Sequence, residues 1–292
     1  MIPKEILKNI RRIQITTSRM VQDVFAGQYQ SVFKGKGMEF DEVREYLPGD
    51  EIRSIDWNVT ARMGHPYIKK FVEERELTVM LLLDMSPSCF FGTVKQLKAQ
   101  LAAEICSVLA FSAIRNNDKV GFIVFTDKIE KFIPPRKGLR HVLRVIREAL
   151  YFKPQGLGTD ITLALEYLNR VTTRRTVSFL ISDFYAPDFK KMLSISNKRH
   201  DLIAITITDP RESELPDIGI VKLDDPESGE AYFVDTSDKF IRSDYARKSE
   251  DRLKAREMLF RSSAVDTIAL RTDIAYAKSL FNFFRQRERR MR

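Results

Sequence analysis

The sequence has few residues of the kinds that build thiol, disulfide or histidine-based sites. Among 292 residues there are two cysteines, three histidines and one tryptophan. Cys89 and Cys106 form no Cys-x-x-Cys pair, which fits a reducing compartment, and we interpret Cys89 as an inert thiol. His65 precedes Pro66 and has no second histidine at metal-ligand spacing, so a loop residue is favoured over a ligand or base.

The sequence also lacks long apolar runs. The longest clean one, Leu77 to Leu83, is far below the roughly 20 residues that a membrane helix needs. The amino terminus, MIPKEILKNIRRIQ, is interrupted by charges and lacks the apolar core and cleavage site of a secretion signal. We therefore expect a cytoplasmic protein with no membrane span. With 43% hydrophobic and 30% charged residues, the chain can bury a core as one large domain or two modest ones.

Positive charge is in excess and is concentrated near the carboxyl terminus. The chain has a formal net charge of +9, and residues 239–292 contain 15 Lys and Arg against 7 Asp and Glu, a net of +8. Such a region could contact nucleic acid, an acidic partner or anionic lipid. A solvated helix face explains it more simply, and no RNA- or DNA-binding pattern of basic and aromatic residues is visible, so no nucleic acid is expected.

One stretch organises the rest of the chain. Leu77 to Leu83 is continuously apolar or β-branched and short, which is typical of a strand buried on both faces in a parallel sheet. Asp84, Ser86 and Ser88 follow at once. Ligands of open α/β sheets bind at the carboxyl ends of the strands, and hard oxygen donors of this kind suit Mg²⁺. We therefore predict half of a divalent-metal site on this loop.

The downstream sequence predicts a matching second half and the fold class. Thr159 and Asp160 open a helical segment, and Asp183 follows the buried strand Val177 to Ile181. Strands and helices alternate from there to the carboxyl terminus, which predicts an α/β fold with a doubly wound, mainly parallel sheet flanked by helices. Asp209 also follows a predicted strand, where it could join the site, although a loop acid before proline is the default. The expected helices are 96–114, 139–151, 161–171, 187–197, 239–260 and 275–287, and the expected strands are 77–83, 119–126, 129–133, 177–181, 202–208 and 267–270, with Pro134 and Pro135 ending the edge strand.

These oxygen-bearing residues resemble the metal-ion-dependent adhesion site of the von Willebrand factor type A domain. That site uses Asp-x-Ser-x-Ser, a later Thr and a later Asp. The resemblance implies that the metal ligands are Asp84, Ser86, Ser88, Thr159 and Asp183, and that the cofactor is Mg²⁺, Mn²⁺ or Ca²⁺. Two positions depart from the pattern: Pro87 stands where glycine is common, and Cys89 follows the second serine.

The segment before the central strand carries a second resemblance. The phrase REYLPGDEIRSIDWNVTAR, from Arg44 to Arg62, resembles the bacterial family known as domain of unknown function number fifty-eight. We predict a leader at 1–76 packed on a type A-like domain at 77–292, which has an inserted hairpin near 218–235 and a carboxyl-terminal helix. Within the leader we expect amphipathic helices from Lys4 to about Val24, a strand at 29–33, a glycine turn at 34–37 rather than a phosphate loop, and a short helix capped by Asp50.

Enzymatic functions fit these residues less well than a binding function. The leader's charged residues and Trp57 could form a catalytic constellation, although a charge-paired lid is favoured. A Mg²⁺-dependent phosphatase of the haloacid dehalogenase kind would need a second Asp where Ser86 stands. We therefore expect a non-enzymatic, metal-dependent protein-interaction module whose partner offers a carboxylate. The family resemblance implies a MoxR-type AAA+ ATPase as that partner.

Overall fold

The computed structural model describes residues 39–72, 76–224 and 230–291. Contacts divide the chain into two compact units, a small one within residues 33–77 and a larger one that includes everything from Thr78 onward, and each is described by itself. The helices predicted between Lys4 and Val24, the strand at 29–33 and the glycine turn lie outside the described residues. The packing of the leader on the main domain stays a prediction.

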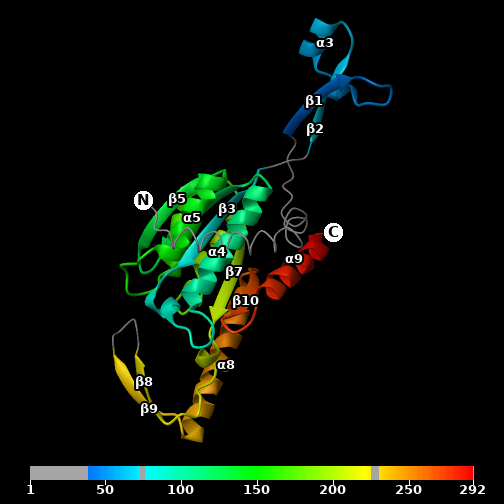
Figure 1. The fold of residues 1–292 in the computed structure, drawn as a ribbon. Coiled ribbons are helices and arrows are strands. Elements are labelled where there is room, and N and C mark those ends of the chain that lie inside the picture. Colours follow the sequence, from blue (N-terminus) through cyan, green and yellow to red (C-terminus); the bar gives the residue numbers. More distant parts are fainter. Residues whose placement is uncertain (1–38, 73–75, 225–229, 292) are drawn as a thin grey trace. The chain divides into compact units, whose positions relative to one another are not determined.

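A six-stranded sheet forms the centre of the larger unit (Figure 1). Its order is β10-β7-β6-β3-β4-β5, and every neighbouring pair is parallel except β4 and β5. The predicted α/β fold with a mainly parallel sheet is therefore confirmed. The strands are β3 (Thr78–Asp84), β4 (Lys119–Phe125), β5 (Ile129–Arg136), β6 (Val177–Ser182), β7 (Asp201–Thr208) and β10 (Asp266–Arg271).

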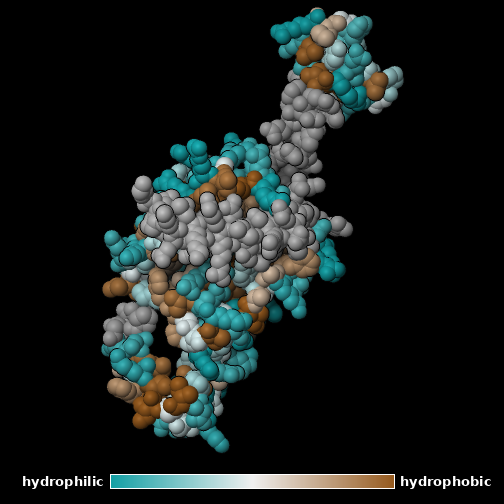
Figure 2. All heavy atoms as spheres, in the orientation of Figure 1, coloured by the Kyte–Doolittle hydropathy of each residue, from teal (hydrophilic) through white to brown (hydrophobic). Residues whose placement is uncertain are grey.

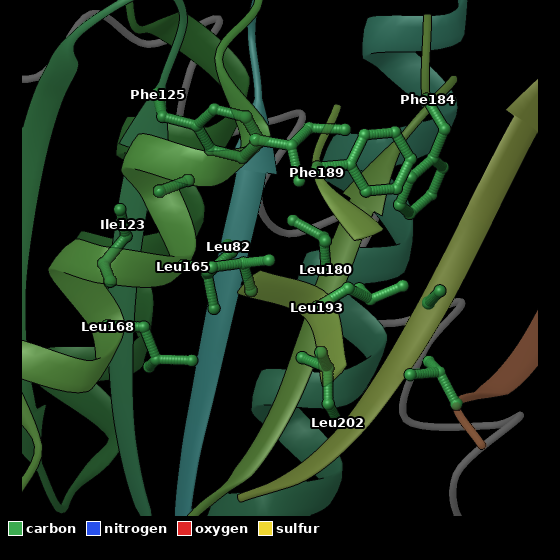
Figure 3. Close-up of a cluster of buried hydrophobic side chains, with 14 of the residues drawn as sticks. Leu82, Ile123, Phe125, Leu165, Leu168, Leu180, Phe184, Phe189, Leu193 and Leu202 are labelled. Carbon is green, nitrogen blue, oxygen red and sulfur yellow. The ribbon is translucent and has the colours of Figure 1, made fainter. Parts of the chain in front are cut away.

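Helices flank this sheet, as the alternating pattern predicted. They are α4 (Lys98–Arg115), α5 (Leu139–Tyr151), α6 (Ile161–Val171), α7 (Lys190–Arg199), α8 (Lys239–Ser262) and α9 (Ala277–Met291). On one side, Leu82 of β3 packs in a cluster with Leu165 and Leu168 of α6 (Figure 3). Helix α4 contacts β3, β4 and β7 and packs against α5. The residues from Val79 to Leu83 are completely buried, which explains their unbroken apolar sequence.

One predicted boundary in the sheet is wrong. Pro134 and Pro135 do not end the edge strand, because β5 continues to Arg136. Proline has no backbone N–H, but among the described strands β5 lies at the edge of the sheet and pairs with β4 alone, so its other side needs no donors for a neighbouring strand. The pairing of β4 and β5 shifts register between Val120 and Phe122, where the prolines interrupt the ladder.

The smaller unit is an antiparallel pair of strands with a helical connection. Strands β1 (Glu39–Glu45) and β2 (Tyr67–Val72) flank a 3₁₀ turn (Ile52–Ser54) and helix α3 (Trp57–Met63). The predicted cap Asp50 is wrong: its carboxylate pairs with Arg44 and accepts from the backbone N–H of Leu47. Asp56 caps α3 instead, accepting from the N–H groups of Asn58 and Val59.

The hairpin predicted near residues 218–235 forms a separate two-stranded sheet. Strands β8 (Ile220–Asp224) and β9 (Ala231–Asp235) pair with each other and not with the central sheet. Large apolar side chains on the hairpin are exposed, among them Ile220, Tyr232 and Phe233. Figure 2 shows apolar residues gathered there. Among the described residues, no helix is long and apolar enough to cross a membrane.

Candidate cation site at the carboxyl edge of the sheet

Strands β3 and β6 bring two aspartates to the same edge. The strands are parallel neighbours paired through Leu83 and Ile181, so Asp84 and the residues after Ile181 leave the sheet together. The hydroxyl of Ser182 donates to Oδ2 of Asp84 at 2.6 Å. Asp84 and Asp183 are 0% and 1% exposed, so both carboxylates are buried where parallel strands end.

The loop after β3 folds its hydroxyl groups back towards Asp84. The backbone N–H of Ser86 donates to Oδ1 of Asp84 at 2.9 Å, and the side-chain oxygens of Ser86 and Ser88 lie 3.1 Å apart. Pro87 begins a short 3₁₀ turn, Pro87–Phe90. The proline that departs from the adhesion-site pattern therefore suits the turn, because its fixed φ fits a first helical position.

The ionisation of Asp84 is unfavourable in this environment. Burial and the charge of Asp183 raise its pKa, the hydrogen bonds from Ser182 and Ser86 lower it, and the net result is a pKa of about 6. A carboxylate that is buried beside another carboxylate is stabilised by a nearby positive charge. The site thus has the electrostatics of a place for a cation.

Backbone strain accompanies Asp183. The next residue, Phe184, has φ of +61°, a left-handed conformation that costs a bulky residue about 1–2 kcal/mol. Its ring packs in the core beside Phe189 (Figure 3). It also lies edge-on to Phe260, with the two ring centres 5.0 Å apart. The backbone N–H of Tyr185 then donates to Oδ1 of Asp183 at 3.1 Å. This turn holds the Asp183 carboxylate at the sheet edge.

The segment before α6 brings Thr159 to the same edge. The backbone N–H of Asp160 donates to the carbonyl of Thr126 at 2.9 Å, and Thr126 follows the residue that is paired with Asp84. A Cβ on Gly156 would collide with Thr126 Oγ1 and Asp127 Oδ1, so the close approach requires glycine. Thr159 itself is half-buried.

Lys98 is a residue of the candidate site that the sequence analysis missed. It is the first residue of α4 and is 2% exposed. Its ammonium donates to Oδ2 of Asp183 at 2.7 Å and pairs with Glu212. A signal was present, because a lysine at the amino end of an otherwise apolar helix opposes the helix dipole and needs an acidic partner. Burial lowers the pKa of Lys98, but Asp183 and Glu212 outweigh it and raise the pKa above its ordinary value.

Cys89 and Asp209 do not extend the candidate donor set. Burial, with the charges of Asp84 and Asp183, raises the pKa of the Cys89 thiol, which fits an inert thiol. The Asp209 carboxylate accepts from Thr93 N at 3.0 Å, Thr93 Oγ1 at 2.5 Å, Thr272 Oγ1 at 2.6 Å and Arg211 N at 3.0 Å. It therefore ties the 91–97 loop to the ends of β7 and β10.

Some of the charged residues considered for other functions form ion pairs with neighbouring side chains. In the smaller unit, Arg44 pairs with Asp50, and the side chain of Trp57 is 66% exposed. On α9, Arg287 pairs with Asp201 and Asp266. The hydroxyl at the phosphatase's general-acid position, Ser86, contacts Ser88 and Cys89.

The donor set fits a divalent cation by its chemistry. In the part of the chain that the structure describes, no group of three or more His, Cys, Asp or Glu side chains is placed to hold a metal. A site here would therefore use two carboxylates and neutral hydroxyl oxygens, which are the hard donors that Mg²⁺, Mn²⁺ and Ca²⁺ accept.

Comparisons with known proteins place the chain in a family. The family model described as "Protein of unknown function DUF58" matches residues 42–255. An uncharacterised protein of Mycobacterium tuberculosis is 31% identical over 285 residues, covering 96% of this chain and 89% of the relative. The uncharacterised protein YeaD of Bacillus subtilis is 22% identical over 181 residues, covering 62% of this chain and 43% of YeaD. Neither the family description nor these relatives indicate a catalytic activity.

Solved structures show weaker similarity. An aerotolerance-related membrane protein from Bacteroides fragilis is 17% identical with a TM-score of 0.49, covering 74% of this chain and 100% of that chain. The conserved hypothetical protein BatB from Bacteroides thetaiotaomicron is 16% identical with a TM-score of 0.46, covering 73% and 99%. The family match and the mycobacterial relative, not these structures, are decisive: the chain belongs to the DUF58 family.

Proposed function

We propose that this protein is a non-enzymatic protein-interaction module that binds its partner through a divalent cation. The cation, Mg²⁺ or alternatively Mn²⁺ or Ca²⁺, would be held by Asp84, Ser86, Ser88, Thr159 and Asp183 in a von Willebrand factor type A-like domain. The observation that supports this most strongly is the buried carboxylate pair, in which the hydrogen-bond donors to Asp84 within the described part of the chain are all neutral.

The chain's own residues would shape the site before any partner arrives. Ser182 and the N–H of Ser86 fix both oxygens of Asp84, and the strained turn at Phe184 fixes Asp183. When bound, the cation supplies a positive centre with a coordination position open to a carboxylate of another protein. Because only two of the proposed ligands are carboxylates and the others are neutral hydroxyl groups, the bound cation could still attract a third carboxylate, from the partner.

Exposed apolar residues support a protein partner. Ile220 is 72% exposed and Phe233 is 76% exposed on the hairpin, and Phe240 at the start of α8 is 76% exposed. Apolar side chains that gather on a surface typically mark a contact with another macromolecule. On family resemblance, we propose that the partner is a MoxR-type AAA+ ATPase.

Binding measurements with the ATPase would test this function. We expect Mg²⁺-dependent capture that is weakened at least about tenfold by chelator and by Asp84→Ala, since the partner carboxylate then loses its bridging ion. The matched control is Asp251→Ala, which removes the same charge from an exposed position on α8. Equal capture of the ATPase by wild type and Asp84→Ala would refute metal-mediated binding.

A further inference from the structure

The two aspartates of the candidate site are compensated unequally. Oδ2 of Asp183 contacts the ammonium of Lys98 at 2.7 Å. Among the described residues, by contrast, the donors to Asp84 are neutral: the Ser182 hydroxyl, and the N–H and hydroxyl of Ser86. The ammonium of Lys98 therefore compensates the charge of Asp183, and the charge of Asp84 has no such compensation within the described residues.

Lys98 is held in this position from several directions. Glu212, its second partner, accepts from the backbone N–H of Asp209 at 2.8 Å, and its own carbonyl accepts from Ser249 of α8 at 2.8 Å. The ammonium also lies 5.7 Å from the centre of the Tyr185 ring, in a cation–π contact. The ammonium at the start of α4 is thus held by Asp183 after β6 and by Glu212 after β7. Helix α8 supports it indirectly, through the bond from Ser249 to Glu212.

We propose that Lys98 is a built-in cation that neutralises Asp183 in the metal-free protein and competes there with a divalent ion. The proposal rests on the function proposed above and adds a regulator to the same site. A fixed ammonium on a ligand oxygen repels an incoming dication and occupies part of the carboxylate's capacity, and both effects are strong because the group is almost completely buried. The metal-free fold is then stable, and metal binding is weak.

The competing explanation is a purely structural ion pair that leaves metal affinity alone. The two explanations differ in one observable, which is the metal affinity after the positive charge is removed. Competition predicts that a neutral residue at position 98 strengthens metal binding, because no ammonium then compensates the Asp183 carboxylate or repels the ion. A structural pair predicts unchanged binding, or weaker binding if the site is disordered.

Calorimetric titration of Mg²⁺ and Mn²⁺ into the full chain would distinguish them. We expect Lys98→Gln and Lys98→Met to bind either ion on the order of tenfold more tightly than wild type. Lys98→Arg keeps the charge and should keep the weak affinity. Lys95→Met is the matched control, because it removes the same charge from an exposed residue whose ammonium bonds the Asp273 carbonyl.

The outcomes separate this proposal from the proposed function. Equal affinity in wild type and Lys98→Gln, abolished by Asp84→Ala, would overturn the role of Lys98 and leave the metal site standing. Absence of Mg²⁺ and Mn²⁺ binding in every variant would overturn both. If the neutral variants are unfolded in chelator, recovery of the fold on adding Mg²⁺ supports the competition, and persistent unfolding overturns it.

Discussion

Two aspartates occupy the same kind of position in this sheet and meet opposite environments. Asp84 follows the buried part of β3 and Asp209 follows β7, and both are at most 1% exposed. Asp209 accepts four hydrogen bonds, and although burial raises its pKa, the bonds from Thr272 and Thr93 lower it overall. Asp84 accepts fewer and faces Asp183, and its pKa rises to about 6.

The different hydrogen bonding and pKa of Asp209 and Asp84 indicate different roles for two aspartates at the same edge of the sheet. A carboxylate that is fully satisfied by neutral donors stabilises the fold in its ionised form. A carboxylate whose ionised form is unfavourable destabilises the fold, unless something binds to it. On this comparison, Asp209 closes the sheet edge, whereas Asp84 has the environment expected of a group that binds a ligand.

The largest effect is expected at Asp209. Asp209→Ala leaves four donors from three residues without their acceptor, so the free energy of unfolding should fall by about 3 kcal/mol. Urea denaturation in chelator measures this. Asp209→Asn, which keeps one acceptor oxygen, should cost less than Asp209→Ala, and an alanine variant as stable as wild type would contradict the structural role.

A change of the opposite sign is expected at Asp84. Asp84→Asn removes the unfavourable buried charge, so in chelator at pH 7 the free energy of unfolding should rise by about 1–2 kcal/mol. The same variant should lose metal binding. The same denaturation experiment tests it, and a destabilised Asp84→Asn would mean that Asp84, like Asp209, serves the fold.

The two carboxylates should also respond to pH in opposite directions. Asp84 has a folded pKa of about 6 against an ordinary value of 3.8, so wild type should lose stability relative to Asp84→Asn as pH rises from about 4 to about 6. Asp209 has a lowered folded pKa, so its contribution is complete above the ordinary value of 3.8 and is lost as pH falls below it. Denaturation of wild type, Asp84→Asn and Asp209→Asn in chelator between pH 3 and 8 measures both responses. If the stabilities of Asp84→Asn and Asp209→Asn, each relative to wild type, changed in the same direction with pH, the two carboxylates would not differ in the way described.

The smallest effect concerns the loop that holds Thr159. Gly156→Ala places a Cβ against Thr126 and Asp127, so the loop must move away from the site and Mg²⁺ affinity should fall about fivefold. Gly158→Ala is the matched control, since its Cβ would make only an ordinary contact with Asp127 Cβ at 3.6 Å. Calorimetry on both variants tests this, and equal affinities would exclude the loop from the site.

Sequence patterns predicted the features of the fold that follow from hydrophobic periodicity and from the positions where strands end. The continuous apolar run identified β3, because a strand that is buried on both faces needs an apolar side chain at nearly every position. The alternation of strands and helices identified the parallel sheet. Capping was less predictable: Asp50 and Asp56 both precede helical turns, and only the backbone geometry decides which carboxylate reaches the free N–H groups. The two prolines of β5 were misread because edge position is a property of the whole sheet.

The candidate site was predictable in part for a related reason. Asp84 and Asp183 follow strands, so their position at the sheet edge could be read from the sequence. The partnership of Lys98 with Asp183 joins residues 85 apart, and with Glu212 it joins residues 114 apart. No local pattern specifies such contacts, and they decide how much of the charge at the site is already compensated.

The response of stability to Mg²⁺ tests the central claim most directly. The thermal unfolding midpoints of wild type and Asp84→Asn would be compared in chelator and in excess Mg²⁺, since a ligand that binds only the folded state stabilises it. We predict that Mg²⁺ raises the midpoint of wild type and leaves that of Asp84→Asn unchanged. Equal responses of the two proteins, or no response of wild type, would contradict a cation site at Asp84.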